Sequence, residues 1–423
     1  MIQFIIDWIA GLIRELFSFC PTSKNSSSRN KNPIGNLRNS KSSLIRLESN
    51  SKTRSQIYTS CLQAEAGFNA YRMAFLDRGI EGSPYGGHVD EYPQRLKRKI
   101  ALAIAGAPQF PTLGELPEID ETQLQFLHPE IQEACICIGG TAGGPFKARW
   151  LGRNALNKVQ FWSTTKIIPI LNLLCTLEED AREACIRDGD RSFELSQAMD
   201  GVMTYDEQIA SSNALAATFK CFQHYTDLEL WVKNISGNRD LNFRGLYGED
   251  PIIGAPTIGK GDRILAKPSR EKKTRASQPG ENLLTAYALT RLMAMAGWHD
   301  RLPKDARLPG MRSDNLELFA RSGGKDIARY VDVAIEELGW QQRIRTPVIL
   351  SKVGYGYSDS RRRTEIAYTC FVQLDDGDGV KSLAMTLRAA TALGDVDREA
   401  VELDARMAVE VSEILRRFLT NRL

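Results

Sequence analysis

A nine-residue apolar run at residues 167–175, IIPILNLLC, restricts the fold of this chain more than any other feature of the sequence. Such a run is suited to burial, yet Lys166 stands directly before it and Ser163 three residues earlier. A lysine ammonium almost never enters a core unless it is paired or functional. If a helix begins near Ser163, positions i and i+3 share one face, so the hydroxyl and the amine would lie side by side at the mouth of a buried helix. The pair is a candidate nucleophile with a candidate base.

The positive charge of the chain belongs to one segment. Residues 21–56 hold eight Lys and Arg side chains and one acid, a charge of +7, in a Ser- and Asn-rich stretch that predicts a basic disordered linker. When this +7 and the −1 of residues 1–20 are taken from the total of +3, the remaining chain carries −3. A slightly acidic body argues against a nucleic-acid partner, because nucleic-acid-binding proteins normally present a basic face.

Residues 1–20 predict an amphipathic helix with isoleucine, leucine and phenylalanine side chains on one face. Charged residues interrupt it too often for a bilayer span, and it lacks the positive start and cleavage site of a signal peptide. Two interpretations stay open. The helix docks on a protein surface, or it makes a peripheral membrane contact with the basic linker behind it.

The eight cysteines and four histidines predict neither a metal site nor a disulfide framework. No CxxC motif occurs and the histidines form no ligand cluster, while Cys135 and Cys137 alternate along an expected strand, which favours burial. We therefore expect no metal and no cofactor.

From residue 57 onward the sequence predicts an ordered protein. Residues 57–127 are expected to form a helical N-terminal extension, with helices at 56–77 and 93–106, and residues 128–423 a single domain. The expected strands of this domain are 134–140 and 145–152, joined as a hairpin, and 347–356 and 365–374 near its end. A mostly helical section at 176–345, with a basic insert at 259–281, separates the two pairs of strands, and a helix at 396–421 closes the chain. We predict an α/β fold in which one antiparallel sheet, whose first and last strands meet, is flanked by helices, with an all-helical subdomain.

Two further segments carry groups that complement Ser163. The Ser-x-x-Lys pattern occurs five times, but only Ser163 stands at a strand-to-helix transition. IASSNALAA contains Ser211 and Asn213, and LSKVGYG contains Lys352 and Gly354. A nucleophile with an amine, a second hydroxyl with an amide, and a lysine on a strand edge form a set suited to acyl transfer.

With these motifs the sequence resembles the penicillin-recognising serine hydrolases, and within them the class A β-lactamases. The resemblance covers roughly residues 128–423 and rests on WSTTK, SSNALAA, KVG with the strand after it, and the closing helix. It implies a β-lactamase/transpeptidase-like fold preceded by the helical and disordered extension.

The resemblance also implies a role for each matching residue. Ser163 attacks a carbonyl carbon and becomes acylated, Lys166 takes its proton, and Ser211 passes a proton to the leaving nitrogen. Substrate binding is assigned to Asn213, which holds an amide side chain, and to Lys352, which pairs with a carboxylate. The backbone amides of Ser163 and of Tyr355, the residue after Gly354, would form the oxyanion hole.

Glu249, in RGLYGEDP, is the best candidate for the base that activates the deacylating water. The asparagine that the family places four residues later is replaced by Ile253, and Val353 replaces the usual hydroxyl residue between Lys352 and Gly354. A literal Ser-Asp-Asn at residues 313–315 lies too close to Lys352 to be the second motif and is better interpreted as a helix start.

The function expected from the resemblance is opening of β-lactam rings through an acyl-enzyme, with antibiotic resistance or β-lactam catabolism as its context. The alternatives are a D-Ala-D-Ala peptidase or penicillin-binding protein acting on cell-wall peptides, a glutaminase, and a non-catalytic envelope protein that retains the fold. The family suggests a periplasmic or membrane-associated location, although no clear export signal is visible. The sequence leaves the natural substrate and the oligomeric state open.

Overall fold

The computed structural model describes residues 52–67, 72–100, 106–141, 144–269 and 282–423, all of which belong to one compact unit, Glu48–Leu423. The amphipathic helix predicted at residues 1–20, most of the linker at 21–56 and part of the basic insert at 259–281 lie outside the described residues. The proposed boundary at residue 128 stays a prediction.

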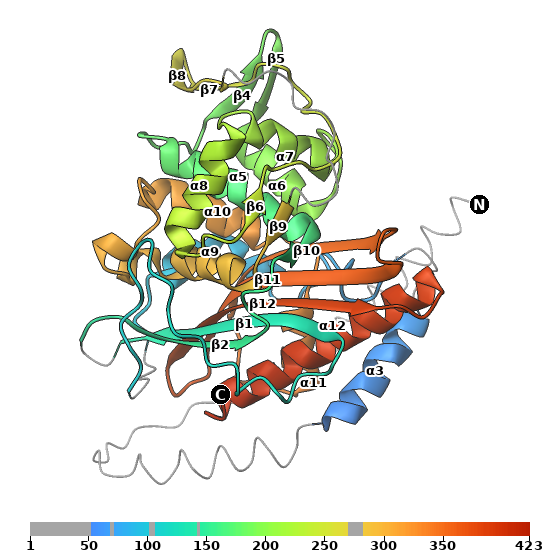
Figure 1. Cartoon of the computed structure of the whole chain (residues 1–423). Helices are drawn as coiled ribbons and strands as arrows, with labels where there is room; N and C mark the ends of the chain where they lie inside the picture. Colours follow the sequence, from blue (N-terminus) through green and yellow to red (C-terminus); the bar gives the residue numbers. More distant parts are fainter. Residues whose placement is uncertain (1–51, 68–71, 101–105, 142–143, 270–281) are drawn as a thin grey trace, which may run out of the picture. The chain divides into compact units, whose positions relative to one another are not determined.

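A five-stranded antiparallel sheet organises this unit (Figure 1). Its order is β10 (Val348–Ser358), β11 (Arg363–Asp375), β12 (Val380–Thr391), β1 (Ile131–Gly140) and β2 (Lys147–Arg153). The predicted hairpin is confirmed, since Cys137 of β1 lies opposite Trp150 of β2. The meeting of early and late strands is also confirmed, because β1 pairs with β12, with Cys135 opposite Thr386.

Helices cover both faces of the sheet, as Figure 1 shows. One face carries α12 (Val396–Leu419), α11 (Tyr330–Glu337) and α3 (Arg54–Ala66). The other carries the helical subdomain, whose helices are α5 (Ile167–Thr176), α6 (Leu195–Thr204), α7 (Ser212–Lys220), α8 (Tyr225–Ser236), α9 (Ala286–Trp298) and α10 (Ser313–Gly323). The predicted fold class is thereby confirmed.

Short elements complete the subdomain and the N-terminal part. One small sheet has the strand order β3 (Val159–Gln160), β9 (Asn282–Leu284) and β6 (Asn242–Phe243). A second has the order β5 (Arg191–Glu194), β4 (Cys185–Asp188), β7 (Thr257–Lys260) and β8 (Arg263–Ala266). The remaining helical turns are η1 (Gly86–Glu91), α4 (Tyr92–Leu96), η2 (Trp162–Lys166), η3 (His299–Arg301) and η4 (Lys304–Ala306).

The closing helix α12 forms where the sequence predicts it. Asp395 caps its first turn by accepting a hydrogen bond from the Arg398 amide at 3.2 Å. Acidic side chains occupy the first turn, and Arg416 and Arg417 the last, so both ends are matched to the helix dipole.

Strand β12 was not predicted from the sequence, and two helices are shorter than predicted. β12, VKSLAMTLRAAT, contains helix-forming Ala, Met and Leu, and it is buried on both faces, so it shows no alternation of polar and apolar residues. The DDGDG turn before it, at residues 375–379, was the available signal for a hairpin. The helix expected at 56–77 ends at Ala66, and the one expected at 93–106 is the short α4, Tyr92–Leu96.

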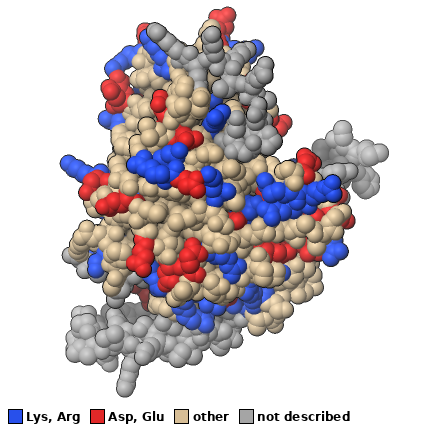
Figure 2. All heavy atoms as spheres, viewed as in Figure 1, with Lys and Arg blue, Asp and Glu red and all other residues tan. Residues whose placement is uncertain are grey.

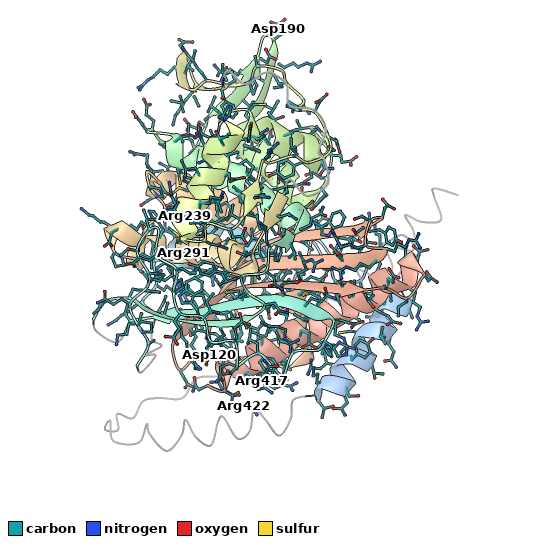
Figure 3. The ribbon with its side chains drawn as sticks, viewed as in Figure 1. Asp120, Asp190, Arg239, Arg291, Arg417 and Arg422 are labelled. Carbon is teal, nitrogen blue, oxygen red and sulfur yellow. The ribbon has the colours of Figure 1, made fainter. Side chains whose placement is uncertain are left out.

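The N-terminal extension protects the outer edge of the sheet. Its backbone at residues 108–120 hydrogen-bonds to β2, as in Ala148 N–H to the Pro108 carbonyl at 3.0 Å. Arg291 of α9, labelled in Figure 3, is fully buried and donates to the carbonyls of Pro111 and Thr112, which fixes this segment to the subdomain. An exposed strand edge is thus covered within the chain.

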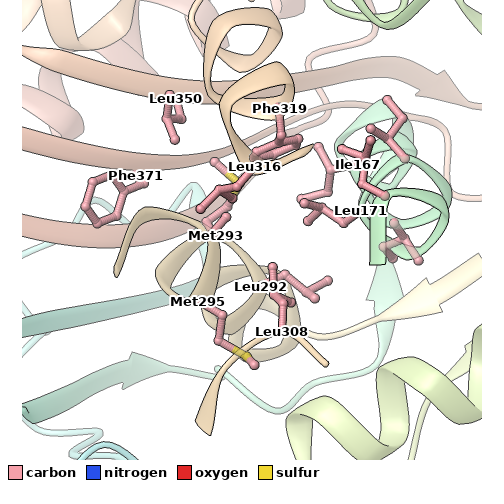
Figure 4. Packing of buried hydrophobic residues seen from close by; sticks show 14 of the residues in the cluster. Ile167, Leu171, Leu292, Met293, Met295, Leu308, Leu316, Phe319, Leu350 and Phe371 are labelled. Carbon is pink, nitrogen blue, oxygen red and sulfur yellow. The ribbon is translucent and has the colours of Figure 1, made fainter. Parts of the chain in front are cut away.

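A continuous apolar core joins the sheet to the subdomain (Figure 4). Ile167 and Leu171 of α5 lie among side chains from the other elements of this core, including Phe319 of α10, Met293 of α9 and Leu350 of β10. The apolar run of the sequence is therefore a buried helix whose position is set by both layers.

Candidate active site

The turn that carries Ser163 and Lys166 is a 3₁₀-helix, Trp162–Lys166, that leads directly into α5. In a 3₁₀-helix residues i and i+3 eclipse one another, so the predicted shared face of Ser163 and Lys166 is present in a tighter form than in an α-helix. Trp162, just before the serine, has φ +52°, a backbone conformation that persists only where the surroundings hold it. Its indole donates to Glu365 at 3.0 Å. Ser163 is half-buried, and its hydroxyl makes no hydrogen bond to the residues that the structure describes.

Pro169 does not disturb this helix. The sequence suggested that it would fall in the second turn of a helix starting near Ser163, where proline removes a hydrogen bond. Because the α-helix begins only at Ile167, Pro169 is its third residue, and the first four backbone amides of a helix have no partner within it. Proline at this position therefore removes no hydrogen bond within α5.

Lys166 is buried, with 1% of its surface exposed, and its amine donates to the Ser212 hydroxyl at 2.9 Å. Burial lowers the pKa of this amine to about 6, the neighbouring positive charge of Lys352 contributes in the same direction, and Glu249 opposes them. The Ser212 hydroxyl itself donates to the Val202 carbonyl at 2.9 Å. At neutral pH Lys166 is therefore mostly an uncharged amine with a lone pair able to accept a proton.

Ser212, and not Ser211, supplies the hydroxyl beside Lys166. Ser211 is the N-cap of α7, where its oxygen accepts from the Ala214 amide at 3.1 Å. Its hydroxyl donates to Glu249. The resemblance assigned the proton relay to Ser211, but the chain turns into the helix between the two serines, and the hydroxyl that contacts Lys166 is that of Ser212.

Glu249 lies at the exposed side of this motif. Its carboxylate accepts from the Ser211 hydroxyl and, at 3.0 Å, from the Asn213 side-chain amide. The structure thus brings together Ser211, Asn213 and Glu249, which the sequence singled out separately. Within the described residues Glu249 makes no hydrogen bond to Ser163 or Lys166.

Lys352, the residue expected to pair with a substrate carboxylate, is buried completely. Its ammonium donates to the Tyr205 hydroxyl at 2.7 Å, the Val353 carbonyl at 3.0 Å and Asp326 at 3.4 Å. Asp326 is also fully buried and accepts from the Ser351 hydroxyl at 2.9 Å. Burial raises the pKa of Asp326, although the charge of Lys352 opposes the shift.

Gly354 is needed for the approach of β10 to the nucleophile. A Cβ atom at this position would lie 2.7 Å from the Ser163 amide nitrogen and 2.7 Å from the Phe161 carbonyl oxygen. The backbone of β10 therefore runs against the Ser163 turn, and Tyr355 follows at the rim of the site, 36% exposed. Peptide amides on two adjoining segments are what an oxyanion hole requires.

The literal Ser-Asp-Asn at residues 313–315 has a structural role. It begins α10, as the sequence predicts, and Asn315 is buried against the carbonyls of Leu174 and Leu177 at the end of α5. It also accepts from the Ala181 amide at 2.9 Å.

The three motif segments therefore meet, and three residues that the sequence analysis passed over complete the cluster, namely Tyr205, Ser212 and Asp326. Ser212 directly follows the predicted Ser211, so the pair of serines in this motif was the available signal for it. Tyr205 and Asp326 belong to no recognised sequence motif, and their roles follow from their contacts with Lys352 in the structure.

Two further features were searched for in the described part of the chain. There, no group of three or more His, Cys, Asp or Glu side chains is arranged to hold a metal ion. Among the same residues, no helix has both the length and the apolar character to cross a membrane. Figure 2 shows both acidic and basic side chains on the viewed face, many of them next to one another.

No protein-family model matches the sequence, and no curated protein does. Among solved structures the chain is similar to a class A β-lactamase from Bacteroides cellulosilyticus, at 11% identity over 68% of this chain and 94% of that one, with a TM-score of 0.43. A β-lactamase from Desulfarculus baarsii is 15% identical over 68% of this chain and 93% of its own, with a TM-score of 0.41. The C-terminal domain of the BlaR penicillin receptor from Bacillus licheniformis is 10% identical over 71% and 97%, with a TM-score of 0.40. These similarities concern the fold, and the chemistry of the site has to be inferred from its own residues.

Proposed function

We propose that this protein is a serine hydrolase that opens β-lactam rings through an acyl-enzyme on Ser163. The observation that carries the proposal is the state of Lys166, a buried amine whose pKa is lowered to about 6 and which shares one face of a 3₁₀ turn with a half-buried serine. A lysine acts as a general base only after losing its proton, and this environment removes the proton at neutral pH.

In acylation the Ser163 oxygen attacks the lactam carbonyl carbon while its proton passes to the Lys166 amine. The negative oxygen of the tetrahedral intermediate is held by the backbone amides of Ser163 and Tyr355; one such donor typically contributes about 3 kcal/mol to lowering the barrier. The C–N bond then breaks, and the leaving nitrogen takes a proton from Lys166 through the Ser212 hydroxyl, which is hydrogen-bonded to that amine. Ser212 thus replaces Ser211 as the proposed relay.

Deacylation needs a base for the attacking water, and we assign this role to Glu249. Ser211 and Asn213 hold its carboxylate at the exposed side of the α7 motif, near enough to Lys166 to raise the pKa of that amine. The water gives one proton to Glu249 and its oxygen bonds to the acyl carbon. The bond between the acyl carbon and the Ser163 oxygen then breaks, and this oxygen takes up, by way of the neutral Lys166 amine, the proton that Glu249 holds, so that all three residues return to their starting states.

The direct test is intact-protein mass spectrometry after brief exposure to benzylpenicillin. We expect a mass increase equal to one antibiotic molecule, absent from Ser163→Ala, which removes only one oxygen atom. Time points then separate acylation from release. Failure of both the wild-type protein and Glu249→Gln to gain mass at any time point would contradict the proposal.

A penicillin-binding protein or D-Ala-D-Ala peptidase is the second candidate. It is favoured by the absence of a hydrogen bond between Glu249 and either Ser163 or Lys166 within the described residues, because slow release is tolerable in such proteins. A wild-type adduct that persists, and that Glu249→Gln does not prolong, would select this candidate. An adduct that forms and disappears in wild type but persists in Glu249→Gln selects the β-lactamase.

A further inference from the structure

We infer that Tyr205 is a positioning residue that closes the site: its ring keeps water from the amines of Lys166 and Lys352, and its hydroxyl occupies the place on Lys352 that an anionic substrate group must take. The inference rests on the proposed function and adds to it a residue that no motif contains.

The ring of Tyr205 lies over both amines. Its centroid is 4.1 Å from the Lys352 nitrogen and 5.1 Å from the Lys166 nitrogen. Lys352 is 0% exposed and Lys166 1%, whereas Tyr205 is itself half-buried. The tyrosine thus stands between the two amines and solvent, as the outer member of the group.

The hydroxyl of Tyr205 completes the hydrogen bonding of Lys352. The ammonium has three protons, and these are directed to the Tyr205 oxygen, the Val353 carbonyl and Asp326. The Tyr205 hydroxyl in turn contacts the Val353 carbonyl at 3.3 Å. Because Asp326 and the carbonyl belong to the buried side, the tyrosine is the only one of the three partners that a substrate carboxylate can displace from outside.

The backbone of Tyr205 suits a residue that moves. It is the C-cap of α6 with φ +57°, a left-handed conformation that a tyrosine adopts only at some cost, and the exposed residues 206–208 follow it. Positions held in such conformations often belong to gates or clamps.

The electrostatics around Lys166 explain why exclusion of water by the Tyr205 ring matters for the pKa of this amine. The charged or titratable groups that face it are Lys352 from β10, Glu249 from the loop after β6, and Tyr205 itself, while Asp326 acts through Lys352. Burial is the largest cause of the lowered pKa of Lys166, so admitting water would return the amine toward its charged form.

Two substitutions separate the ring from the hydroxyl. Tyr205→Gly removes the ring and suits the positive φ, so backbone strain does not confound the result. Tyr205→Phe keeps the ring and removes the hydroxyl. Tyr357→Phe, at an exposed tyrosine further along β10, is the matched control.

The first measurement does not depend on turnover. The folded protein is treated with an amine-acetylating reagent, and modification of Lys352 is quantified by peptide mass spectrometry. Labelling of a fully buried amine requires a local opening, so we expect Tyr205→Gly to increase it roughly tenfold and Tyr205→Phe to leave it close to wild type. Unchanged labelling in Tyr205→Gly would overturn the inference.

The second measurement is the acylation rate with benzylpenicillin as a function of pH. In Tyr205→Gly the acid limb should move upward by about one pH unit, since a hydrated Lys166 keeps its proton longer. Tyr205→Phe should keep the limb in place and bind the anionic penicillin about three- to tenfold more tightly, because Lys352 then has a proton without a partner. An unmoved limb in Tyr205→Gly, or weaker binding in Tyr205→Phe, would contradict the inference. If neither wild type nor Glu249→Gln forms an adduct, the proposed function fails while the labelling experiment still decides whether Tyr205 covers the amines.

Discussion

Lys166 and Arg329 are both buried basic side chains, but only one of them has a counter-ion. Arg329 is fully buried and contacts Asp332 through two hydrogen bonds, at 2.7 and 3.2 Å. Burial favours loss of its charge, yet the charge and hydrogen bonds of Asp332 outweigh burial and raise the pKa of Arg329. Lys166 has no ion pair within the described residues, and burial together with the charge of Lys352 lowers its pKa to about 6.

The comparison shows that burial alone does not decide what a basic side chain does in this fold. Arg329 stays charged and joins α11 to Ser83 and the Gly324 carbonyl. Lys166 is given a hydroxyl partner, Ser212, and a second cation nearby, so it loses its charge. A structural cation and a candidate base differ by the placement of one carboxylate.

Lys166→Met is expected to have the largest effect on acylation, a loss of about 10²–10⁴-fold, because it removes the general base. The folded protein should not be weakened. The pKa of Lys166 is about 6 in the folded protein and 10.5 in the unfolded chain, so between these two pH values unfolding takes up a proton. In this pH range the lysine lowers the free energy of unfolding, and that free energy rises as the pH rises. We expect Lys166→Met to raise the free energy of unfolding at pH 7 by about 1–3 kcal/mol in urea titrations. A marked loss of stability would show that Lys166 is charged and paired in the fold.

Arg329→Met is expected to have the opposite pattern. It leaves Asp332 buried without a counter-ion, which should lower the free energy of unfolding by about 3–5 kcal/mol. The double variant Arg329→Met/Asp332→Asn should recover most of that loss, and acylation by the folded fraction should stay close to wild type. Equal stability of the single and double variants would contradict the account of the pair.

Lys352 and Asp326 form an intermediate case, a buried pair at 3.4 Å that lies next to the base. Removing both charges, in Lys352→Met/Asp326→Asn, leaves no unpaired buried ion and withdraws the positive charge that lowers the pKa of Lys166. The acid limb of the acylation rate should therefore move to higher pH by about one unit. An acid limb that stays in place would show that the charge of Lys352 does not affect the pKa of Lys166.

Glu249→Gln should have the smallest electrostatic effect. The carboxylate of Glu249 is exposed and raises the pKa of Lys166, so its neutral isostere should move the acid limb of acylation to lower pH by a few tenths of a unit. Stopped-flow acylation at low ionic strength measures this difference between Glu249→Gln and wild type. Added salt screens the exposed charge of Glu249 in wild type and should therefore remove the difference. A movement to higher pH would have the wrong sign.

Local patterns predicted much of this fold because they describe interactions between residues close in the chain. The hairpin of β1 and β2 and the closing helix α12 followed from periodicity and turns. β12 did not, because a strand buried on both faces loses the alternation by which a strand is recognised. The helix expected at 56–77 stopped at Ala66, since periodicity does not locate helix ends reliably.

The sequence by itself determined that Ser163 and Lys166 share one face at the head of a buried helix, because spacing of three along a helical turn and an apolar continuation are local facts. Only the tertiary structure decided that Ser212 rather than Ser211 faces the Lys166 amine, and that Lys166 has no counter-ion within the described residues. It also decided that Asp326 and Tyr205 accept hydrogen bonds from Lys352. These outcomes depend on which groups from distant segments are brought within a few ångströms, and electrostatic and hydrogen-bond energies vary over that distance rather than with separation along the chain.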